Sequence, residues 1–175
     1  MRDLIALDLP AGDTFVAELR RAWDNGDAVL PVDQRLPADA KALLVDRLGA
    51  GVVVERAGRT RRGGLPVETD DALVVATSGT TGEPKGVILT HQAVAASAEI
   101  TSNALAVDET DHWLACLPVA HIGGLAVITR ALITGTGLTA LESFSVNAVE
   151  DAARNGATLV SLVVTALRRV DPSLF

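Results

Sequence analysis

Tyrosine is absent from this 175-residue chain, and aromatic residues make up only 3% of it. A core built with so few large rings must be filled by alanine, valine, leucine and isoleucine, which suit buried parallel strands and helices with small faces. Hydrophobic residues supply 49% of the sequence, so the composition excludes a disordered chain. The length allows one domain with a sizeable core.

Cysteine is nearly absent as well, because Cys116 is the only one, and this excludes an internal disulfide. Cys116 lies in the apolar run 113–117, and we interpret it as a small core residue. The chain contains no Cys/His spacing that is typical of a zinc site, so we predict no metal ligands among its residues.

Positive charge is in deficit, since the formal net charge is −7, and this argues against a nucleic-acid partner. The basic run 59–64 holds no aromatic residue for base stacking and is interpreted as a solvated loop. The longest apolar stretches, 125–133 and 159–167, are far too short to span a membrane, and Arg130 interrupts the first. The first residues lack the pattern of a signal peptide, so we expect a soluble cytoplasmic protein.

Lysine is rare too, with only Lys41 and Lys85 in the chain. Lys85 lies in the string TSGTTGEPKG at residues 77–86, which the apolar run 72–76 precedes and the apolar run 87–89 follows. Glycines allow the backbone to approach an anion closely, and successive N–H groups, hydroxyls and one lysine can together hold a polyphosphate. The candidate phosphate ligands are Thr77, Ser78, Gly79, Thr80, Thr81, Gly82 and Lys85.

Other interpretations of this string fit less well. A flexible turn between two strands would account for Gly-Thr-Thr-Gly alone, but not for the full ten residues. A Walker A motif needs Gly before the lysine and Ser or Thr after it, whereas Pro84 and Gly86 flank Lys85. A nucleophile elbow needs Gly two positions before the serine, and Ala76 stands there.

Strand-like and helix-like segments alternate along the chain, which predicts an α/β fold with a layered sheet flanked by helices. Asp13, Thr90 and Ser145 are expected N-caps, and residues 56–71 are expected to form the longest loop and to divide the chain into two sub-parts. The expected strands are 28–32, 51–55, 72–77, 86–89, 112–117, 138–141 and 158–164, and the expected helices are 13–24, 38–48, 91–105, 124–133, 145–154 and 166–170.

A second glycine pattern, GTGLTA at residues 135–140, fits the loose dinucleotide-binding consensus Gly-x-Gly-x-x-Ala. That motif follows a strand and opens a helix. Here it follows an expected helix and precedes an expected strand, so we interpret it as a helix end and a turn.

His121 is one of three histidines. It follows Pro118 and precedes Gly123 and Gly124, so its backbone is expected to be loop-like and close to a cleft. The two glycines either permit close approach of a substrate or simply lead into a helix, and the sequence leaves both interpretations open. A single histidine is more often structural than functional, and His91 and His112 are expected to be structural.

The string 77–86 closely resembles the phosphate loop of the adenylate-forming superfamily, which includes acyl- and aryl-CoA ligases, luciferases and peptide-synthetase adenylation domains. The resemblance extends from about residue 28 to the C-terminus and implies the N-terminal portion of the large domain of such an enzyme. Three further segments carry it, namely residues 28–37, 89–91 and 117–125.

Members of this family join a carboxylic acid to ATP, release pyrophosphate, and transfer the acyl group from the adenylate to coenzyme A. The resemblance therefore implies that ATP, Mg²⁺ and coenzyme A are used and that the partner is a small carboxylic acid. It implies that Lys85 and residues 77–82 hold the phosphates. It also implies that His121, Gly123 and Gly124 shape the acid pocket, with Lys85 and His121 as the catalytic residues.

The later motifs of the family are not found in these residues, including its Tyr-Gly-x-Thr-Glu segment and the C-terminal domain with a catalytic lysine. We therefore expect residues 1–175 to be a partial N-terminal domain that binds ATP weakly, is inactive alone, and self-associates through an uncovered sheet edge. The short leader is most similar to o-succinylbenzoate–CoA ligases of menaquinone synthesis. A general acyl-CoA synthetase and a stand-alone nucleotide- or phosphate-binding module are the alternatives.

Overall fold

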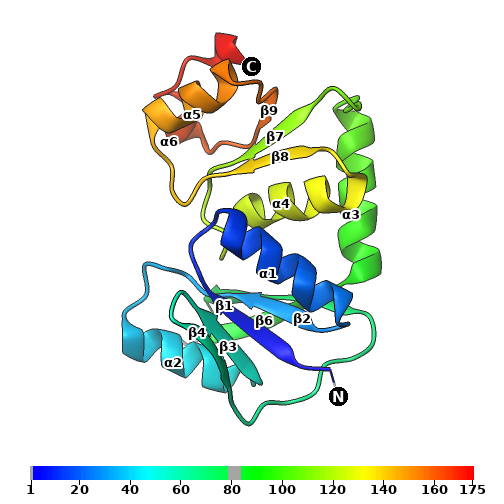
Figure 1. Ribbon diagram of the computed structural model, residues 1–175, viewed down its shortest axis with the longest axis vertical. Helices are drawn as coiled ribbons and strands as arrows, with labels where there is room; N and C mark the ends of the chain where they lie inside the picture. Colours follow the sequence, from blue (N-terminus) through cyan, green and yellow to red (C-terminus); the bar gives the residue numbers. More distant parts are fainter. Residues whose placement is uncertain (1, 79–83) are drawn as a thin grey trace.

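The computed structural model describes residues 2–78 and 84–175, which form alternating layers of helix and sheet (Figure 1). A six-stranded sheet and a three-stranded sheet are stacked with helices between them and helices on both outer faces. The α/β fold with a sheet flanked by helices, expected from the sequence, is confirmed, and it consists of two sheets.

The larger sheet is formed by β1 (Leu4–Asp8), β2 (Ala28–Pro31), β3 (Val52–Glu55), β4 (Gly58–Arg61), β5 (Asp71–Ser78) and β6 (Pro84–Thr90). Its strand order is β4-β3-β1-β2-β5-β6. The strands β1, β2, β3 and β5 pair in parallel, and β4 and β6 are antiparallel partners at the two edges. The carboxyl ends of the parallel strands therefore lie at one edge, which is where ligands bind in open α/β sheets.

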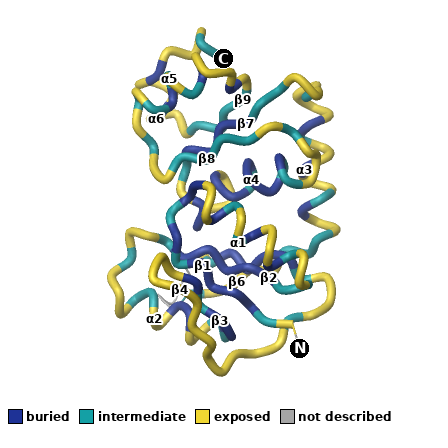
Figure 2. The backbone as a smooth tube through the Cα atoms, viewed as in Figure 1, coloured by how far each residue is buried: buried dark blue, intermediate teal, exposed yellow. Residues whose placement is uncertain are grey.

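Two helices cover the faces of this sheet, α1 (Asp13–Asp24) on one and α2 (Ala38–Arg47) on the other (Figure 1). Successive side chains of a strand point to opposite faces. Accordingly, Ile5 and Leu7 join the core that contains α1, and Leu4 and Ala6 join the core that contains α2. Because both faces are covered, β1 and β2 are buried along most of their length (Figure 2), and their sequences are continuous apolar runs.

The smaller sheet contains β7 (His112–Ala115), β8 (Gly137–Ala140) and β9 (Leu159–Val160), which pair in parallel in the order β8-β7-β9. Between the sheets, α4 (Ile122–Thr134) packs against α3 (His91–Ala104). Beyond the smaller sheet lie α5 (Val146–Arg154), α6 (Val164–Leu167) and the 3₁₀ turn Pro172–Leu174. One continuous core joins the two sheets, with Phe15, Val29, Trp113 and Ile128 among its members, so the sheets pack as one unit.

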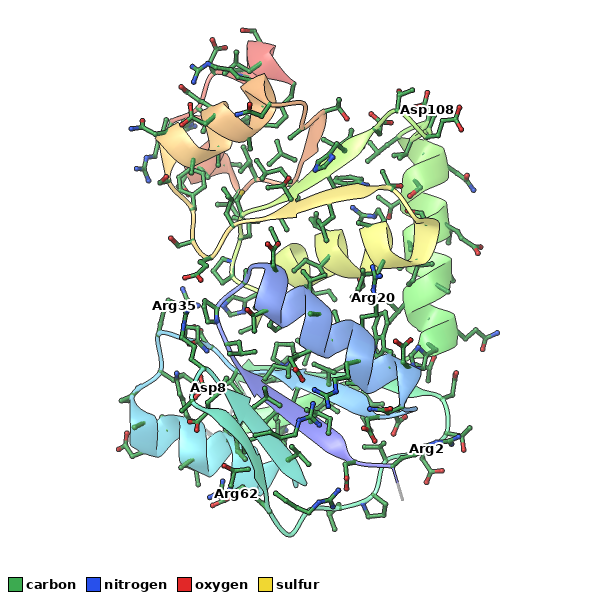
Figure 3. The ribbon with its side chains drawn as sticks, viewed as in Figure 1. Arg2, Asp8, Arg20, Arg35, Arg62 and Asp108 are labelled. Carbon is green, nitrogen blue, oxygen red and sulfur yellow. The ribbon has the colours of Figure 1, made fainter. Side chains whose placement is uncertain are left out.

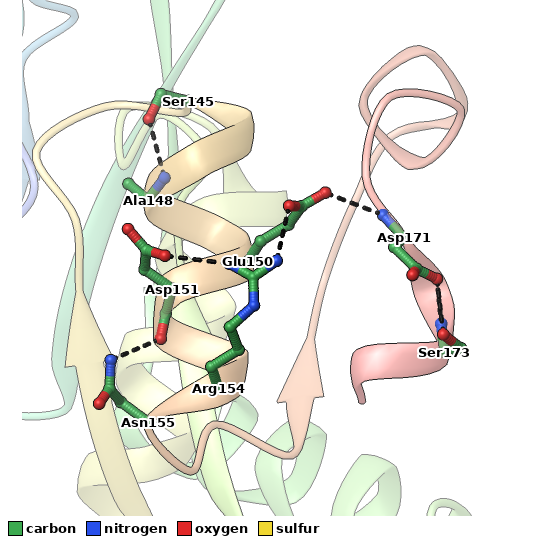
Figure 4. A network of polar contacts seen from close by, with 8 residues as sticks. All are labelled: Ser145, Ala148, Glu150, Asp151, Arg154, Asn155, Asp171 and Ser173. Atoms are coloured by element: carbon green, nitrogen blue, oxygen red, sulfur yellow. Dashed lines mark hydrogen bonds and ion pairs between the residues drawn. The ribbon is translucent and has the colours of Figure 1, made fainter.

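Two of the expected helix caps are confirmed. The Thr90 hydroxyl accepts the backbone N–H of Ala93 at 3.1 Å. The Ser145 hydroxyl accepts the backbone N–H of Ala148 at 3.2 Å (Figure 4). Each bond satisfies one of the amides that have no partner in the first turn of a helix.

The third expected cap is wrong. Gly12 is the N-cap of α1, with φ of 125° and no side-chain cap, and Asp13 is the first helical residue. The Asp13 carboxylate still lies in the first turn, where the helix dipole favours negative charge.

Several strands differ from those expected from the sequence. The strand β1 was not predicted, because it is a short apolar run whose period is ambiguous until its partners β2 and β3 are known. The segment 56–71, expected to be a loop, contains β4, whose exposed residues form a strand because they pair with β3. Strands on both sides of this segment belong to one sheet. The strand expected at 158–164 is limited to Leu159–Val160.

Candidate functional site

The expected phosphate loop joins the antiparallel strands β5 and β6. Thr77 lies opposite Lys85 and Ser78 opposite Pro84, and the Thr77 hydroxyl donates to the Lys85 carbonyl at 3.3 Å. Two strands that are paired up to this point fix the positions at which the connecting residues begin and end. The predicted phosphate ligands Gly79, Thr80, Thr81 and Gly82 lie outside the described residues, as does the side chain of Ser78.

Lys85 is exposed on β6, and its amine has no ion-pair partner within residues 2–78 and 84–175. The other lysine, Lys41, forms an ion pair with Asp8, with its amine 2.6 Å from the carboxylate. An unpaired ammonium beside a loop of glycine and threonine is free to bind an anion. Of the two lysines, Lys85 is therefore the one without an ion pair among the described residues.

His121 is the N-cap residue of α4, with an extended backbone. Its side chain is 59% exposed. Its Nε2 atom lies 2.6 Å from Nη2 of Arg35 and 3.8 Å from a carboxylate oxygen of Asp33. Arg35 extends from the loop after β2 toward the part of the molecule that holds the smaller sheet (Figure 3). Neither partner was predicted from the sequence, because only the packing of the two sheets brings Asp33 and Arg35 to His121.

Arg35 and Asp33 are themselves tightly paired. The guanidinium donates to the Asp33 carboxylate through Nε at 2.9 Å and through Nη2 at 2.7 Å. Chiefly because of the side-chain hydrogen bond from Arg35, the pKa of Asp33 is lowered to about 2. The same bond raises the pKa of Arg35. At neutral pH both groups are therefore charged, and the pair forms a fixed neighbour for His121.

Gly123 and Gly124 lie inside the first turn of α4, which begins at Ile122 and not at 124 as the sequence suggested. A Cβ atom on Gly124 would lie 2.5 Å from the carbonyl oxygens of both Leu117 and Pro118, whereas a Cβ on Gly123 would meet nothing within 4 Å. Gly124 is thus needed for the close contact of α4 with the preceding loop.

Substituting Gly124 by alanine is expected to lower the free energy of unfolding by roughly 1–3 kcal/mol, because the backbone must shift to relieve the contact. Gly123→Ala is the matched control and is expected to be neutral, or to stabilise by up to about 1 kcal/mol through its helix propensity. Urea denaturation of both variants measures the difference. Equal free energies of unfolding for the two variants would show that the close packing at Gly124 does not contribute to stability.

The remaining sequence interpretations concern structural residues. His91 contacts Trp23 edge to face with ring centroids 5.2 Å apart, and Nε2 of His112 lies 2.8 Å from the Thr139 hydroxyl. Gly135 ends α4 in the left-handed conformation, with φ of 73°, and β8 follows, so the glycine pattern there is a helix end and not a dinucleotide motif. Cys116 is buried, and burial raises the pKa of its thiol to about 11, so it is an inert core residue.

A groove of about 190 Å³ lies between α3 and α4 and reaches β5 and β6. It exists because the facing helix positions carry small side chains, which leave space that larger residues would fill. Its walls are mostly apolar, and Arg130 is the one ionic residue among the described residues that line it. The lining residues are Leu73, Leu89, Ala93, Val94, Ser97, Ala98, Ile122, Ala126, Thr129 and Arg130.

Arg130 lies over the Trp113 ring, with its guanidinium carbon 4.7 Å from the ring centroid. Its Nε atom is buried without a hydrogen-bond partner, and no carboxylate pairs with it in the part of the chain that the structure describes. Burial lowers the pKa of Arg130, but a guanidinium remains charged in proteins. A half-buried cation without an anion, at an apolar groove, is suited to bind the carboxylate of an organic ligand.

Two kinds of site are not found in the described part of the chain. Residues 2–78 and 84–175 contain no group of three or more His, Cys, Asp or Glu side chains arranged to hold a metal ion. None of the helices within these ranges combines the length and the apolar character needed to cross a membrane.

Residues 15–173 match the family of AMP-binding enzymes. This match covers most of the chain, and the chain belongs to that family. Over 91 residues it is 38% identical to a 2-succinylbenzoate–CoA ligase of Bacillus mycoides (strain KBAB4), a match that covers 51% of this chain and 19% of that protein. The adenylate-forming resemblance seen in the sequence is confirmed.

Solved structures share the fold. O-succinylbenzoate coenzyme A synthetase from Bacillus subtilis in complex with AMP superimposes with a TM-score of 0.84 at 24% identity, over 100% of this chain and 54% of that one. The same enzyme in complex with ATP and magnesium ion gives a TM-score of 0.81 at 23% identity, over 96% of this chain and 53% of that one. The chain thus spans about half the length of these solved structures.

Proposed function

We propose that this chain is the ATP- and acid-binding part of an AMP-forming acid–CoA ligase, and that its acid is 2-succinylbenzoate or a related aromatic dicarboxylate. The observation that carries the proposal is Lys85, which has no ion-pair partner among the described residues and lies on β6 at the carboxyl edge of the larger sheet, in a chain of the AMP-binding enzyme family. The names of the relatives support the choice of acid.

The first chemical step must bring an anionic carboxylate to an anionic triphosphate. A carboxylate oxygen attacks the α-phosphorus of ATP, and the bond to the β-phosphate oxygen breaks to release pyrophosphate. The coenzyme A thiol then attacks the acyl carbon of the adenylate and displaces AMP. Both steps depend mainly on positioning and on electrostatic stabilisation.

The residues of this chain would act in the first step. Lys85 would bind the β- and γ-phosphates and stabilise the charge that develops on the departing pyrophosphate. Bound Mg²⁺ would neutralise the remaining phosphate charge. The hydroxyls of Ser78, Thr80 and Thr81 and the amides of Gly79 and Gly82 would donate to the same phosphates, while the Thr77 hydroxyl donates to the Lys85 carbonyl.

The groove between α3 and α4 supports an aromatic dicarboxylate over a simple fatty acid. Both Ile122, which follows His121 at the start of α4, and Arg130 line the groove. Because an α-helix rises about 1.5 Å per residue, Ile122 and Arg130 are about 12 Å apart along the axis of α4. We place the reacting carboxylate of the acid at the His121 end and its second carboxylate at Arg130. A general acyl-CoA synthetase, the alternative, would leave the Arg130 charge without a partner.

Two measurements on the 175-residue chain test this proposal. Titration calorimetry with ATP and Mg²⁺ is expected to show saturable but weak binding that pyrophosphate competes away. ATP–pyrophosphate exchange with 2-succinylbenzoate is expected to stay near background, since the later family motifs are missing from these residues. No ATP binding would contradict the nucleotide site, and clear exchange would overturn the expectation that the chain is inactive alone.

A further inference from the structure

Three polar side chains connect the two sheets at their carboxyl edges. Asp33 and Arg35 lie in the turn after β2 of the larger sheet, where Leu36 N–H donates to the Asp33 carbonyl at 3.1 Å. His121 lies at the start of α4, after β7 of the smaller sheet. The backbone N–H of Arg35 also donates to the Asp33 carboxylate at 3.0 Å. Asp33 therefore fixes both the backbone and the guanidinium of Arg35.

The short contact between Arg35 and His121 determines where the imidazole proton lies. A guanidinium has only N–H donors, so at the 2.6 Å contact Nη2 of Arg35 donates and Nε2 of His121 accepts. An imidazole that accepts at Nε2 while neutral carries its proton on Nδ1. The ring is 59% exposed, so a ligand can reach it.

We propose that Arg35 is a positioning residue that holds His121 as the neutral Nδ1–H tautomer, so that His121 donates a hydrogen bond to the acid substrate and does not act as a base. The idea rests on the proposed ligase function. Nε2, the one free lone pair of the neutral ring, is occupied by Arg35, which leaves Nδ1–H as the only group that can contact a substrate oxygen. A substrate carboxylate accepts such a bond and needs no base, because it is already ionised at neutral pH.

The Asp33 carboxylate has a second effect, because it neutralises Arg35. A free guanidinium next to His121 would attract the substrate carboxylate or an ATP phosphate to itself. Because Arg35 is paired with Asp33 through two hydrogen bonds, it orients the imidazole and does not attract these anions. The hydrogen-bond donor presented to the substrate is then neutral and has a fixed direction.

Long-range ¹H–¹⁵N NMR of the histidine rings tests the proposal directly, since the chain has only three histidines and His121→Asn identifies the signal. Above the pH at which imidazoles lose their charge, His121 is expected to show the Nδ1–H pattern. Arg35→Gln is expected to shift it to the Nε2–H pattern, and Arg35→Lys, which cannot contact Asp33 as a fork, to shift it partly. An Nε2–H pattern in the unaltered chain, or no change in Arg35→Gln, would overturn the proposal.

Arg56→Gln is the matched control. Arg56 is also exposed and also pairs with a distant residue, Glu142, at 2.6 Å, but it does not contact His121. This variant is expected to leave the His121 tautomer unchanged.

Calorimetric titration with 2-succinylbenzoate gives the functional readout. Arg35→Gln is expected to weaken acid binding about tenfold, the loss of one well-aligned hydrogen bond, with ATP affinity unchanged and Arg56→Gln normal for both ligands. Equal acid affinity in Arg35→Gln and the unaltered chain would overturn the positioning role while leaving the proposed function intact. Absence of acid binding by the unaltered chain would overturn the proposed function, and with it the donor role of His121.

Discussion

Replacing Lys85 by alanine is expected to weaken the binding of ATP with Mg²⁺ by about 10- to 100-fold, because one charged hydrogen bond to a phosphate contributes roughly 1.5–3 kcal/mol. Lys85 is exposed and makes no ion pair within the described ranges, so the substitution removes a ligand contact without disturbing the core. Titration calorimetry on the 175-residue chain measures the change, and thermal denaturation is expected to show the same midpoint as the unaltered chain.

The chain supplies its own control in Lys41, its only other lysine. The Lys41 amine lies 2.6 Å from the Asp8 carboxylate and is largely shielded from solvent. Lys41→Ala is therefore expected to lower the melting temperature and to leave the affinity for ATP unchanged. If Lys85→Ala binds ATP as tightly as the unaltered chain, the phosphate role of Lys85 is refuted.

Replacing Arg130 by glutamine is expected to reduce the affinity for 2-succinylbenzoate by roughly 30-fold, since the loss of one charged hydrogen bond at a half-buried site costs about 2 kcal/mol. The loss is expected to be specific for the second carboxylate. Binding of 4-phenyl-4-oxobutanoate, which lacks the ring carboxylate, is expected to be weak in the unaltered chain and unchanged in Arg130→Gln. Calorimetric titration of both acids into the unaltered chain and into Arg130→Gln measures the interaction energy between Arg130 and the ring carboxylate.

Arg130→Gln also removes the contact with Trp113. A control variant is therefore needed to distinguish a loss of protein stability from a loss of carboxylate binding. Arg169 lies over Phe144 in the same way, with its guanidinium carbon 5.3 Å from the ring centroid, but it does not line the groove. Arg169→Gln is expected to leave the binding of both acids unchanged. An equal loss for the two acids in Arg130→Gln would indicate that Arg130 supports the groove and does not recognise a carboxylate.

Most features that depend on residues close together in the chain were predicted correctly, and the N-cap expected at Asp13 is an exception. Thr90 and Ser145 cap helices because each hydroxyl reaches an amide three residues further on, and this requires no tertiary contact. The alternation of strands and helices was readable because it follows from local runs of apolar residues. Gly135 was predicted to end a helix for the same local reason.

Features that depend on distant partners were missed. Residues 58–61 are exposed and polar, and they form β4 only because β3 offers an unpaired edge. Arg130 was noted only as an interruption of an apolar stretch, because the groove beside it is formed by α3, α4 and the β5–β6 pair together. The contact of Arg35 with His121 joins residues 86 positions apart, and no local pattern indicates it.

The sequence by itself determined the α/β class and the identity of the family, and it predicts the phosphate-binding chemistry of the loop at residues 77–86, because each is encoded in residue types within a few positions of one another. Only the tertiary structure decided which side chains meet. The larger sheet runs in the order β4-β3-β1-β2-β5-β6, so neighbours in space are not neighbours in the chain. Closing the two sheets around a shared core is what brings Arg35 to His121 and leaves Arg130 beside an open groove.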